Sequence, residues 1–305
     1  MRYYFAPLEG ITDRVFRDIH HHFYPGIDRY YTPFLSPTIH RSLTQKELRE
    51  IPPAAQLPYL CIPQILTKNA DDFLWLAQQC RDLGYTEVNL NLGCPSGTVT
   101  AKGKGSGMLR TPDALVSFLD NIFSGTDMPI SIKTRIGYAE AAEFPALLEI
   151  YNRYPICELI IHPRVRGDFY NGQVNMDVFR FAAKKSKNAI CYNGDITNLS
   201  QIAVLPKVDA VMLGRGLIAD PGLVCGDSSP ETLKAYLTAL LEGYIQVFGN
   251  ASNAMFRLKE HWHYLQYRFE GCEKLIKQLR KTTDVDEFFS IMSYILDECP
   301  IKKSL

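Results

Sequence analysis

Eight short apolar stretches within the first 214 residues are the feature that most constrains the fold of this chain. Helical or loop segments lie between them, and this alternation is typical of parallel βα units. The expected strands are residues 3–8, 28–32, 59–66, 87–92, 129–135, 158–162, 189–193 and 210–214. Eight strands with eight crossovers predict a (β/α)8 TIM barrel of the α/β class, and a doubly wound sheet is the alternative.

Apolar residues at helical spacing occur between the predicted strands and throughout the C-terminal part of the chain. Residues 71–83 carry apolar side chains at helical spacing, and residues 112–123 follow Thr111 as a cap with Pro112 in the first helical position. From about Pro230 onward only helical patterns occur, which predicts a small C-terminal helical domain. We therefore expect a catalytic barrel over residues 1–228 and a helical domain over residues 229–305, with residues 220–229 as the linker.

Composition narrows the class of protein. A chain of 305 residues with 46% hydrophobic content can bury a large core, and it has no apolar run of the roughly 20 residues needed to span a bilayer. The eight cysteines are scattered, with no C-x-x-C pair and no spacing typical of zinc. We expect a cytoplasmic protein with reduced thiols, no metal and no membrane segment, and we expect a monomer. The net charge of zero argues against a global positive field but permits a local basic surface.

The segment from Glu87 to Leu109, EVNLNLGCPSGTVTAKGKGSGML, is the predicted chemical centre. Its strand places amides on one face, and the Gly-Cys-Pro turn then holds Cys94 at the carboxyl end of the strand, where barrels keep their chemistry. Lys102 and Lys104 follow among glycines, so an anion or a nucleic-acid backbone would fit this loop. The alternative for Cys94 is a small buried apolar residue.

Chemically capable residues end each predicted strand. Side chains at the carboxyl ends of barrel strands converge on one mouth, so this pattern predicts an active site there. The residues concerned are Pro7, Glu9, Pro33, Gln64, Asn91, Cys94, Lys133, Arg135, His162, Arg164, Asn193, Asp195, Gly214 and Arg215.

Two of these loops suit a phosphate group. Asn193-Gly194-Asp195 and Gly214-Arg215-Gly216 follow the last two strands, where many barrels bind phosphate, and a tight turn with a solvated arginine is the alternative.

Lys133 is a cation in an otherwise apolar strand, and lysines are seldom buried without a partner. Its alternative is a lysine that reaches solvent at the end of the barrel.

The motifs also carry a resemblance. The run V-N-L-N-L-G-C-P, with Gly105-Ser106 eleven residues after Cys94, and A-P-L-E-G-I-T-D at residues 6–13 resemble the signatures of the tRNA-dihydrouridine synthases, flavoenzymes that reduce uridine in tRNA. The chain departs from the family pattern at Asn89 (Asp in the family), at Leu8 (Met) and at His162-Pro-Arg-Val (His-Gly-Arg-Thr). The resemblance extends from residue 6 to about residue 216, and the helical tail matches only in position and size.

The resemblance implies FMN as cofactor, NADPH as reductant and tRNA as partner. Hydride would pass from reduced flavin to C6 of uridine, and Cys94 would give a proton to C5, for which an ordinary thiol pKa of about 8.5 suffices. It implies cofactor contacts from Ala6, Pro7, Leu8, Gln64, Lys133, His162, Asn193, Gly194, Asp195, Gly214 and Arg215, and substrate contacts from Asn91, Lys104, Arg135 and Arg164. The rivals are a dihydroorotate-type dehydrogenase of a free pyrimidine and a non-catalytic tRNA-binding barrel.

Basic and aromatic residues alternate in the helical tail, which suits an RNA backbone with stacked bases. A solvated helix face with an aromatic core stripe is the alternative. The residues are Arg257, Lys259, His261, Trp262, His263, Tyr264, Tyr267, Arg268, Lys274, Lys277, Arg280 and Lys281.

Overall fold

The computed structural model describes residues 1–38, 40–227 and 229–302. These residues form two compact units, the first comprising residues 1–7, 28–194 and 205–212, and the second comprising residues 8–27, 195–204 and 213 onward. The predicted domain boundary at residue 228 and the predicted end of the helical domain at residues 303–305 lie outside the described residues. The division into domains at that boundary therefore stays a prediction.

Each of the eight predicted stretches contains strand, so the predicted fold class is confirmed. The strands are β1 Arg2–Phe5, β2 Arg29–Tyr31, β3 Cys61–Ile62, β4 Gln64–Ile65, β5 Val88–Leu92, β6 Ile130–Arg135, β7 Leu159–His162, β8 Ile190–Asn193 and β9 Ala210–Leu213. They follow the order β3-β2-β1-β9-β8-β7-β6-β5-β4 in one sheet. Val88, Leu90 and Leu92 of β5 are fully buried, as expected for parallel strands that are covered on both faces.

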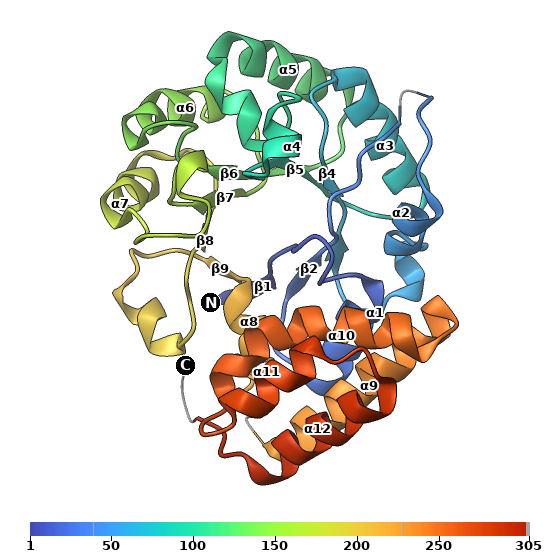
Figure 1. The fold of residues 1–305 in the computed structure, drawn as a ribbon. Helices are drawn as coiled ribbons and strands as arrows, with labels where there is room; N and C mark the ends of the chain where they lie inside the picture. The colour runs from blue at the N-terminus through green and yellow to red at the C-terminus, as the bar shows by residue number, and fades with distance from the viewer. Residues whose placement is uncertain (39, 228, 303–305) are drawn as a thin grey trace. The chain divides into compact units, whose positions relative to one another are not determined.

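The sheet closes into a barrel at Pro63. The two outermost strands in the sheet order, β3 and β4, are consecutive in the chain and are separated by this proline alone. Proline has no N–H to donate, but its carbonyl accepts a hydrogen bond from the Asn89 N–H at 2.8 Å, and the Thr32 hydroxyl accepts from the Gln64 N–H at 3.0 Å. These bonds bridge the interruption, and closure excludes the doubly wound alternative (Figure 1).

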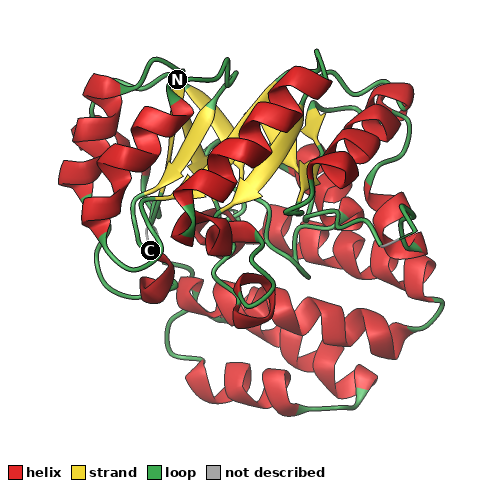
Figure 2. Cartoon of the chain, turned by 90° about the horizontal axis from the view of Figure 1, so that it is seen from above, coloured by secondary structure: helices red, strands yellow, loops and turns green. Residues whose placement is uncertain are grey.

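Helices lie around the strands of the barrel (Figure 2), and those of the first unit include both outer helices and short turns in the loops. They are α2 Gln45–Glu50, α3 Ala70–Asp82, α4 Gly97–Thr100, α5 Pro112–Gly125, α6 Phe144–Tyr151 and α7 Met176–Lys185. Asn69 and Asn175 cap α3 and α7 with their side chains. Thr111 occupies the predicted cap position of α5, but its side chain makes no capping hydrogen bond, so Pro112 at the first position carries the start of this helix.

The second unit is helical. It contains α1 Arg14–Phe23, α8 Arg215–Ala219, α9 Pro230–Phe248, α10 Ala251–Leu265, α11 Glu273–Lys281 and α12 Val285–Glu298. The last four confirm the predicted helical tail. Phe16 of α1 packs edge-on against Tyr236 of α9, and Gly243 leaves room for Val15 and Ile19 of α1. Among the described residues, the helices lack the combination of length and hydrophobicity that a membrane crossing requires.

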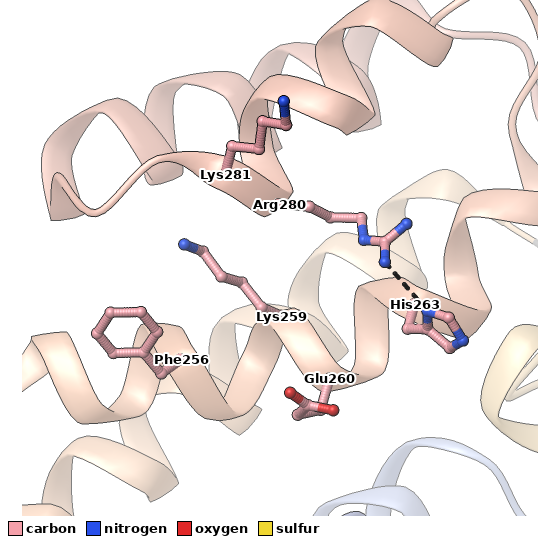
Figure 3. Close-up of a pocket in the computed structure, with 6 residues that line it drawn as sticks. All are labelled: Phe256, Lys259, Glu260, His263, Arg280 and Lys281. Carbon is pink, nitrogen blue, oxygen red and sulfur yellow. Dashed lines mark hydrogen bonds between the residues drawn. The ribbon is translucent and has the colours of Figure 1, made fainter.

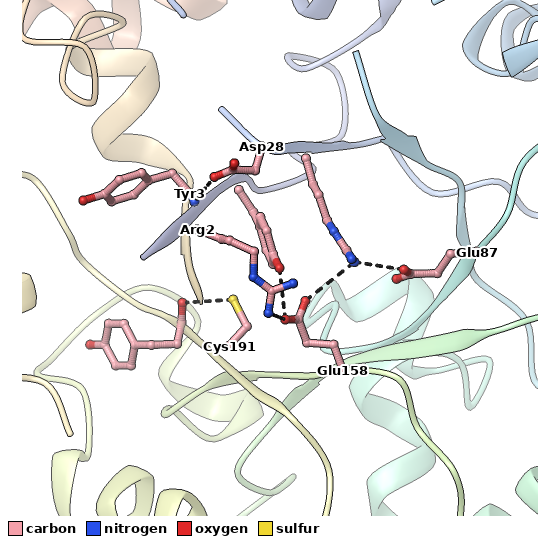
Figure 4. A network of polar contacts seen from close by, with 9 residues as sticks. Arg2, Tyr3, Asp28, Glu87, Glu158 and Cys191 are labelled. Carbon is pink, nitrogen blue, oxygen red and sulfur yellow. Dashed lines mark hydrogen bonds and ion pairs between the residues drawn. The ribbon is translucent and has the colours of Figure 1, made fainter. Parts of the chain in front are cut away.

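A partly buried ionic network joins the amino ends of the barrel strands (Figure 4). Arg29 donates to Glu87 at 2.9 Å, while Arg2 and Tyr4 both donate to one carboxylate oxygen of Glu158, at 3.3 and 3.0 Å. Burial raises the pKa of Glu158 despite the neighbouring arginines. Because the network lies at the end of the barrel opposite Cys94, its contribution is to strand pairing rather than to the site.

Two buried histidines hold the second unit together. His20 contacts the Pro221 carbonyl through Nε2 at 3.1 Å, so this nitrogen carries the proton. His261 stacks on Phe16 with ring centroids 5.2 Å apart, and its Nε2 lies 3.1 Å from the Tyr244 hydroxyl. Burial lowers the pKa of each imidazole to about 3, so both are neutral in the folded protein near neutral pH.

We expect these histidines to make the second unit acid-sensitive. Below about pH 6.5 these histidines bind protons in the unfolded state but not in the folded state. The free energy of unfolding therefore falls by about 1.4 kcal/mol per histidine for each unit by which the pH is lowered. Urea unfolding between pH 7 and pH 5 measures this slope. His20→Gln keeps a donor for the Pro221 carbonyl and should remove one histidine's share, whereas His22→Gln, at an exposed position of the same helix, should leave the slope unchanged. An unaltered slope in His20→Gln would contradict the assignment.

Candidate active site

A chain of amides crosses the inside of the barrel from β4 to β6. The Gln64 Nε2 donates to Asn89 Oδ1 at 2.8 Å, the Asn89 Nδ2 donates to Ser131 Oγ at 2.9 Å, and the Asn91 Nδ2 donates to Gln64 Oε1 at 2.7 Å. All four side chains are buried. Asn89 acts as donor and acceptor at once, with the Ser131 hydroxyl as its acceptor and the Gln64 amide as its donor.

Asn91 connects this chain to the Gly-Cys-Pro turn. Its Oδ1 accepts hydrogen bonds from the Gly93 N–H at 3.0 Å and the Cys94 N–H at 2.9 Å. On the other side, the Cys94 carbonyl accepts from the Ser106 N–H at 3.2 Å and the Ser106 hydroxyl at 2.8 Å. The backbone of Cys94 is thus fixed from two directions, and its side chain is only partly buried. The predicted reactive thiol lies at the carboxyl end of β5, as expected.

Lys133 lies beside Asn91 in the sheet. The two residues are paired in the register of β5 and β6. The other polar side chains of β6 are hydrogen-bonded to neighbouring residues. The Lys133 ammonium makes no hydrogen bond or ion pair with any residue that the structure describes. Burial and the nearby Arg135 charge lower its pKa to about 8. A desolvated cation without a partner suits the anionic edge of a ligand.

Two buried arginines hold the loop that follows β7. Arg135 donates to the carbonyls of Gly93, Val165 and Phe169, at 3.0, 2.8 and 2.5 Å. Its guanidinium therefore ties the Cys94 turn to this loop. Substrate contacts by Arg135 stay a prediction, and the structure gives its side chain a positioning role in addition.

Arg164 fixes the far end of the same loop. It donates to the Asn171 carbonyl at 3.1 Å and the Gly172 carbonyl at 2.5 Å, and its Nη1 lies 3.1 Å from His162 Nε2. A guanidinium can only donate, so His162 Nε2 is the acceptor and the imidazole proton lies on Nδ1. His162 also stacks on Tyr170, with ring centroids 6.2 Å apart.

Lys104 reaches across to the loop after β2. Its Nζ donates to the Ser36 hydroxyl at 3.0 Å, and burial together with Lys102 lowers its pKa. Gly103 and Gly105 on either side have positive φ angles of 69° and 57°, which explains the glycines of this segment. The predicted glycine-rich basic loop thus carries one partly buried lysine, and its substrate contact remains a prediction.

The predicted cofactor residues near the chain's first and last barrel strands fall in both compact units. Ala6, Pro7, Asn193 and Gly194 belong to the first, and Leu8, Asp195, Gly214 and Arg215 belong to the second. In the first unit, Asn193 donates to the Met212 carbonyl at 2.8 Å, which ties β8 to β9. In the second, Arg215 pairs with Asp195 at 2.6 Å, and Leu8 closes a turn with Thr12. Their contacts with a cofactor stay predictions.

The helical tail divides the predicted RNA-binding residues into two groups. His261, Trp262 and Arg268 are buried, and Arg268 is bound to Asp220 at 2.9 Å, so these three belong to the core and the prediction is wrong for them. A groove of about 320 Å³ lies between α10 and α11 (Figure 3). It is lined by Phe256, Lys259, Glu260, His263, Arg280 and Lys281. This groove keeps four of the basic residues available to a ligand.

Sequence inspection missed three aromatic residues on the first unit. The guanidinium groups of Arg110 and Arg166 both lie close to the Tyr138 ring, and Phe169 and Tyr170 are 40% and 50% exposed. The signal in the sequence is the run Arg166-Gly-Asp-Phe-Tyr170, in which two consecutive aromatic residues stand in an otherwise polar loop.

Comparison with known proteins gives a consistent result. The chain matches the family described as dihydrouridine synthase (Dus) over residues 4–292. It is 27% identical over 300 residues to the probable tRNA-dihydrouridine synthase 1 of Synechocystis, covering 92% of this chain and 82% of that protein. It is 30% identical over 220 residues to tRNA-dihydrouridine synthase B of Escherichia coli K12, covering 71% and 68%. A solved structure of an NCR variant from Zymomonas mobilis shares the fold, with a TM-score of 0.50, 13% identity and coverage of 77% and 87%.

Substitution of Gly105 should disturb the Cys94 turn specifically. An added Cβ would lie 3.0 Å from both the Cβ and the carbonyl oxygen of Cys94, and the residue has φ +57°. We expect Gly105→Ala to destabilise the protein by about 1–3 kcal/mol and to lower activity. Gly97→Ala, in the same loop with nothing within 4 Å, is the matched control and should behave like the wild type. Equal thermal stability of the two variants would show that the turn is not tightly packed.

Proposed function

Since the chain belongs to the dihydrouridine synthase family, we propose that it is an FMN-dependent oxidoreductase that reduces a uridine of tRNA to 5,6-dihydrouridine. The observation that carries the proposal is the placement of Cys94 by Asn91 and Ser106 at the carboxyl end of β5, beside the unpaired Lys133. A proton donor and a partly buried cation at one mouth are what reduction of a polarised double bond requires.

The residues on the inside of the barrel fit a flavin. Lys133 offers a desolvated ammonium for the N1–O2 edge of the isoalloxazine ring, which becomes negative on reduction. Gln64 and His162 supply further polar groups, and the remaining predicted contacts come from Ala6, Pro7, Leu8, Asn193, Gly194, Asp195, Gly214 and Arg215. Bound FMN supplies the hydride for C6 of uridine, and NADPH is the proposed external reductant.

Cys94 supplies the proton in this proposal. The thiol gives its proton to C5 as hydride reaches C6, so the C5=C6 double bond becomes saturated and the thiolate regains a proton from solvent. Asn91 fixes the turn that carries the thiol, while Lys104, Arg135 and Arg164 are the proposed substrate contacts. A positioned acid of this kind contributes roughly 10²- to 10⁴-fold to the rate.

The helical tail is the proposed second tRNA contact. Lys274, Lys277, Arg280 and Lys281 of α11 are exposed, and Arg280 lies 3.1 Å from His263 Nδ1 in the groove of Figure 3. Lys259 donates to the Thr282 carbonyl from the opposite wall. A basic helix of this kind suits phosphates of an RNA backbone. We place the enzyme in the cytoplasm as a monomer.

A flavin dehydrogenase of a free pyrimidine is the alternative that the site itself permits. Such an enzyme could use the same thiol and the same lysine. It would have no use for the Lys102–Lys104 loop or for the basic face of α11, which are features of the chain that favour RNA.

Replacement of Cys94 tests the chemistry. We expect Cys94→Ala to retain flavin and to lose about 10²- to 10⁴-fold in uridine reduction, because only the acid is removed. The measurement is anaerobic reoxidation of the reduced enzyme by tRNA that lacks dihydrouridine, with the product counted in the RNA. Cys225→Ala, at an exposed cysteine of the second unit, is the matched control.

Free uracil and orotate serve as the substrate controls in the same experiment. Reoxidation by tRNA alone supports the proposal, whereas reoxidation by a free pyrimidine moves the enzyme to the alternative class. Unchanged turnover in Cys94→Ala removes the thiol from the mechanism.

A further inference from the structure

Four side chains from three segments of the first unit form an alternating series of cations and rings. The Arg110 guanidinium lies 4.9 Å from the centre of the Tyr138 ring, and the Arg166 guanidinium lies 5.6 Å from the centre of the same ring. Arg166 also lies 5.2 Å from the centre of the Phe169 ring. We call Arg110, Tyr138, Arg166 and Phe169 the arginine–aromatic ladder.

The two arginines of the ladder have no carboxylate partner among the described residues. Two acids of the same loops are engaged elsewhere: Asp168 accepts from the Val165 N–H, and Glu143 accepts from the N–H groups of residues 138–140. The Arg166 Nε is buried and has no hydrogen-bond partner. Neither arginine is fully buried, since Arg110 is exposed and Arg166 is partly exposed, so both charges are available to an outside anion.

Both arginines are attached to the segment that follows Cys94. Arg110 donates to the Thr100 carbonyl at 3.0 Å, and Arg166 donates to the Thr100 hydroxyl at 3.3 Å. The same segment closes onto the Cys94 carbonyl through Ser106. The ladder therefore lies on the loop that holds the reactive thiol and not on a remote face of the barrel.

The Phe169 side chain is 40% exposed, although phenylalanine is usually buried. Its φ angle is +49°, a left-handed conformation that is strained for a residue with a side chain. Its carbonyl is held by Arg135, the guanidinium that also binds the Cys94 turn. The neighbouring Tyr170 ring lies against His162 and the Arg135 guanidinium. A strained, clamped and exposed ring beside a reactive group suits stacking with an aromatic ligand.

We propose that the arginine–aromatic ladder binds the RNA strand next to the target uridine, with Arg110 and Arg166 on phosphates and Phe169 stacked on an unpaired neighbouring base. Alternating cations and rings are how proteins hold single-stranded nucleic acid, because every base has a π-face and every linkage has a charge. The assignment rests on the proposed function. It explains how the enzyme can prefer a uridine within RNA to free uracil, since a free base reaches none of these groups.

The test compares ladder variants with matched variants on the outer helix α7. Arg166→Gln and Phe169→Leu remove one cation and one ring, while Arg180→Gln and Phe181→Leu make the same changes at exposed positions of α7. The measurements are the Kd for tRNA at several salt concentrations and the rate of reoxidation of the reduced enzyme by tRNA. Flavin absorbance and thermal unfolding confirm that each variant is folded.

We expect Phe169→Leu to weaken tRNA binding by about 5- to 100-fold, the effect of one lost stacking contact. Arg166→Gln should lower the slope of log Kd against log salt by about 0.7, the share of one phosphate on a single strand. Reoxidation at saturating tRNA should change little. The α7 variants should match the wild type in all measurements.

Two outcomes overturn the proposal and leave the proposed function intact. Ladder variants that bind tRNA like the wild type, with the same salt slope, show that RNA does not touch the ladder. A loss that is equal in the ladder variants and the α7 variants shows that the effect is not specific to this surface. If tRNA fails to reoxidise the wild-type enzyme, the proposed function itself is wrong.

Discussion

The carboxamide of Asn91 is the constraint on which the site depends. Its Nδ2 belongs to the buried amide chain of the barrel, and its Oδ1 receives the N–H groups of Gly93 and Cys94. Only an amide can do both, because a carboxylate would accept the two N–H groups but could not donate to Gln64. The position of the Cys94 backbone is therefore tied to the amide chain inside the barrel, through hydrogen bonds that are costly to break.

Arg135 extends this constraint to the next loops. Three carbonyls, from Gly93, Val165 and Phe169, converge on one buried guanidinium whose five N–H groups have a fixed geometry. A lysine could satisfy the charge but not this planar arrangement. The loops after β5 and β7 therefore keep one relative position, and preorganisation of this kind lowers the entropy that a reaction must otherwise lose in its transition state.

The fold could be predicted because parallel strands appear in the sequence as short apolar stretches. The hydrogen-bond partners of individual polar groups could not be predicted. Buried apolar stretches that end in polar residues predicted all the strands and the position of Cys94. Whether a polar atom is already bonded depends on residues far away in sequence, as for Asn91 with Gln64, or Arg268 with Asp220. The arginine–aromatic ladder could not be predicted from the sequence for the same reason, since Arg110, Tyr138 and Arg166 come into contact only in the folded barrel.

A net charge of zero is compatible with RNA binding once the pairing of charges is considered. Distant basic groups such as Arg29 and Lys234 are neutralised by Glu87 and Asp297, while Lys133, Arg110 and Arg166 have no carboxylate partner within the described residues. At physiological salt, charges act over about 8 Å, so such a protein attracts RNA weakly from afar and strongly on contact. Affinity then depends on correct placement of the strand beside Cys94, which favours a uridine that is presented in one geometry over the many uridines that are not.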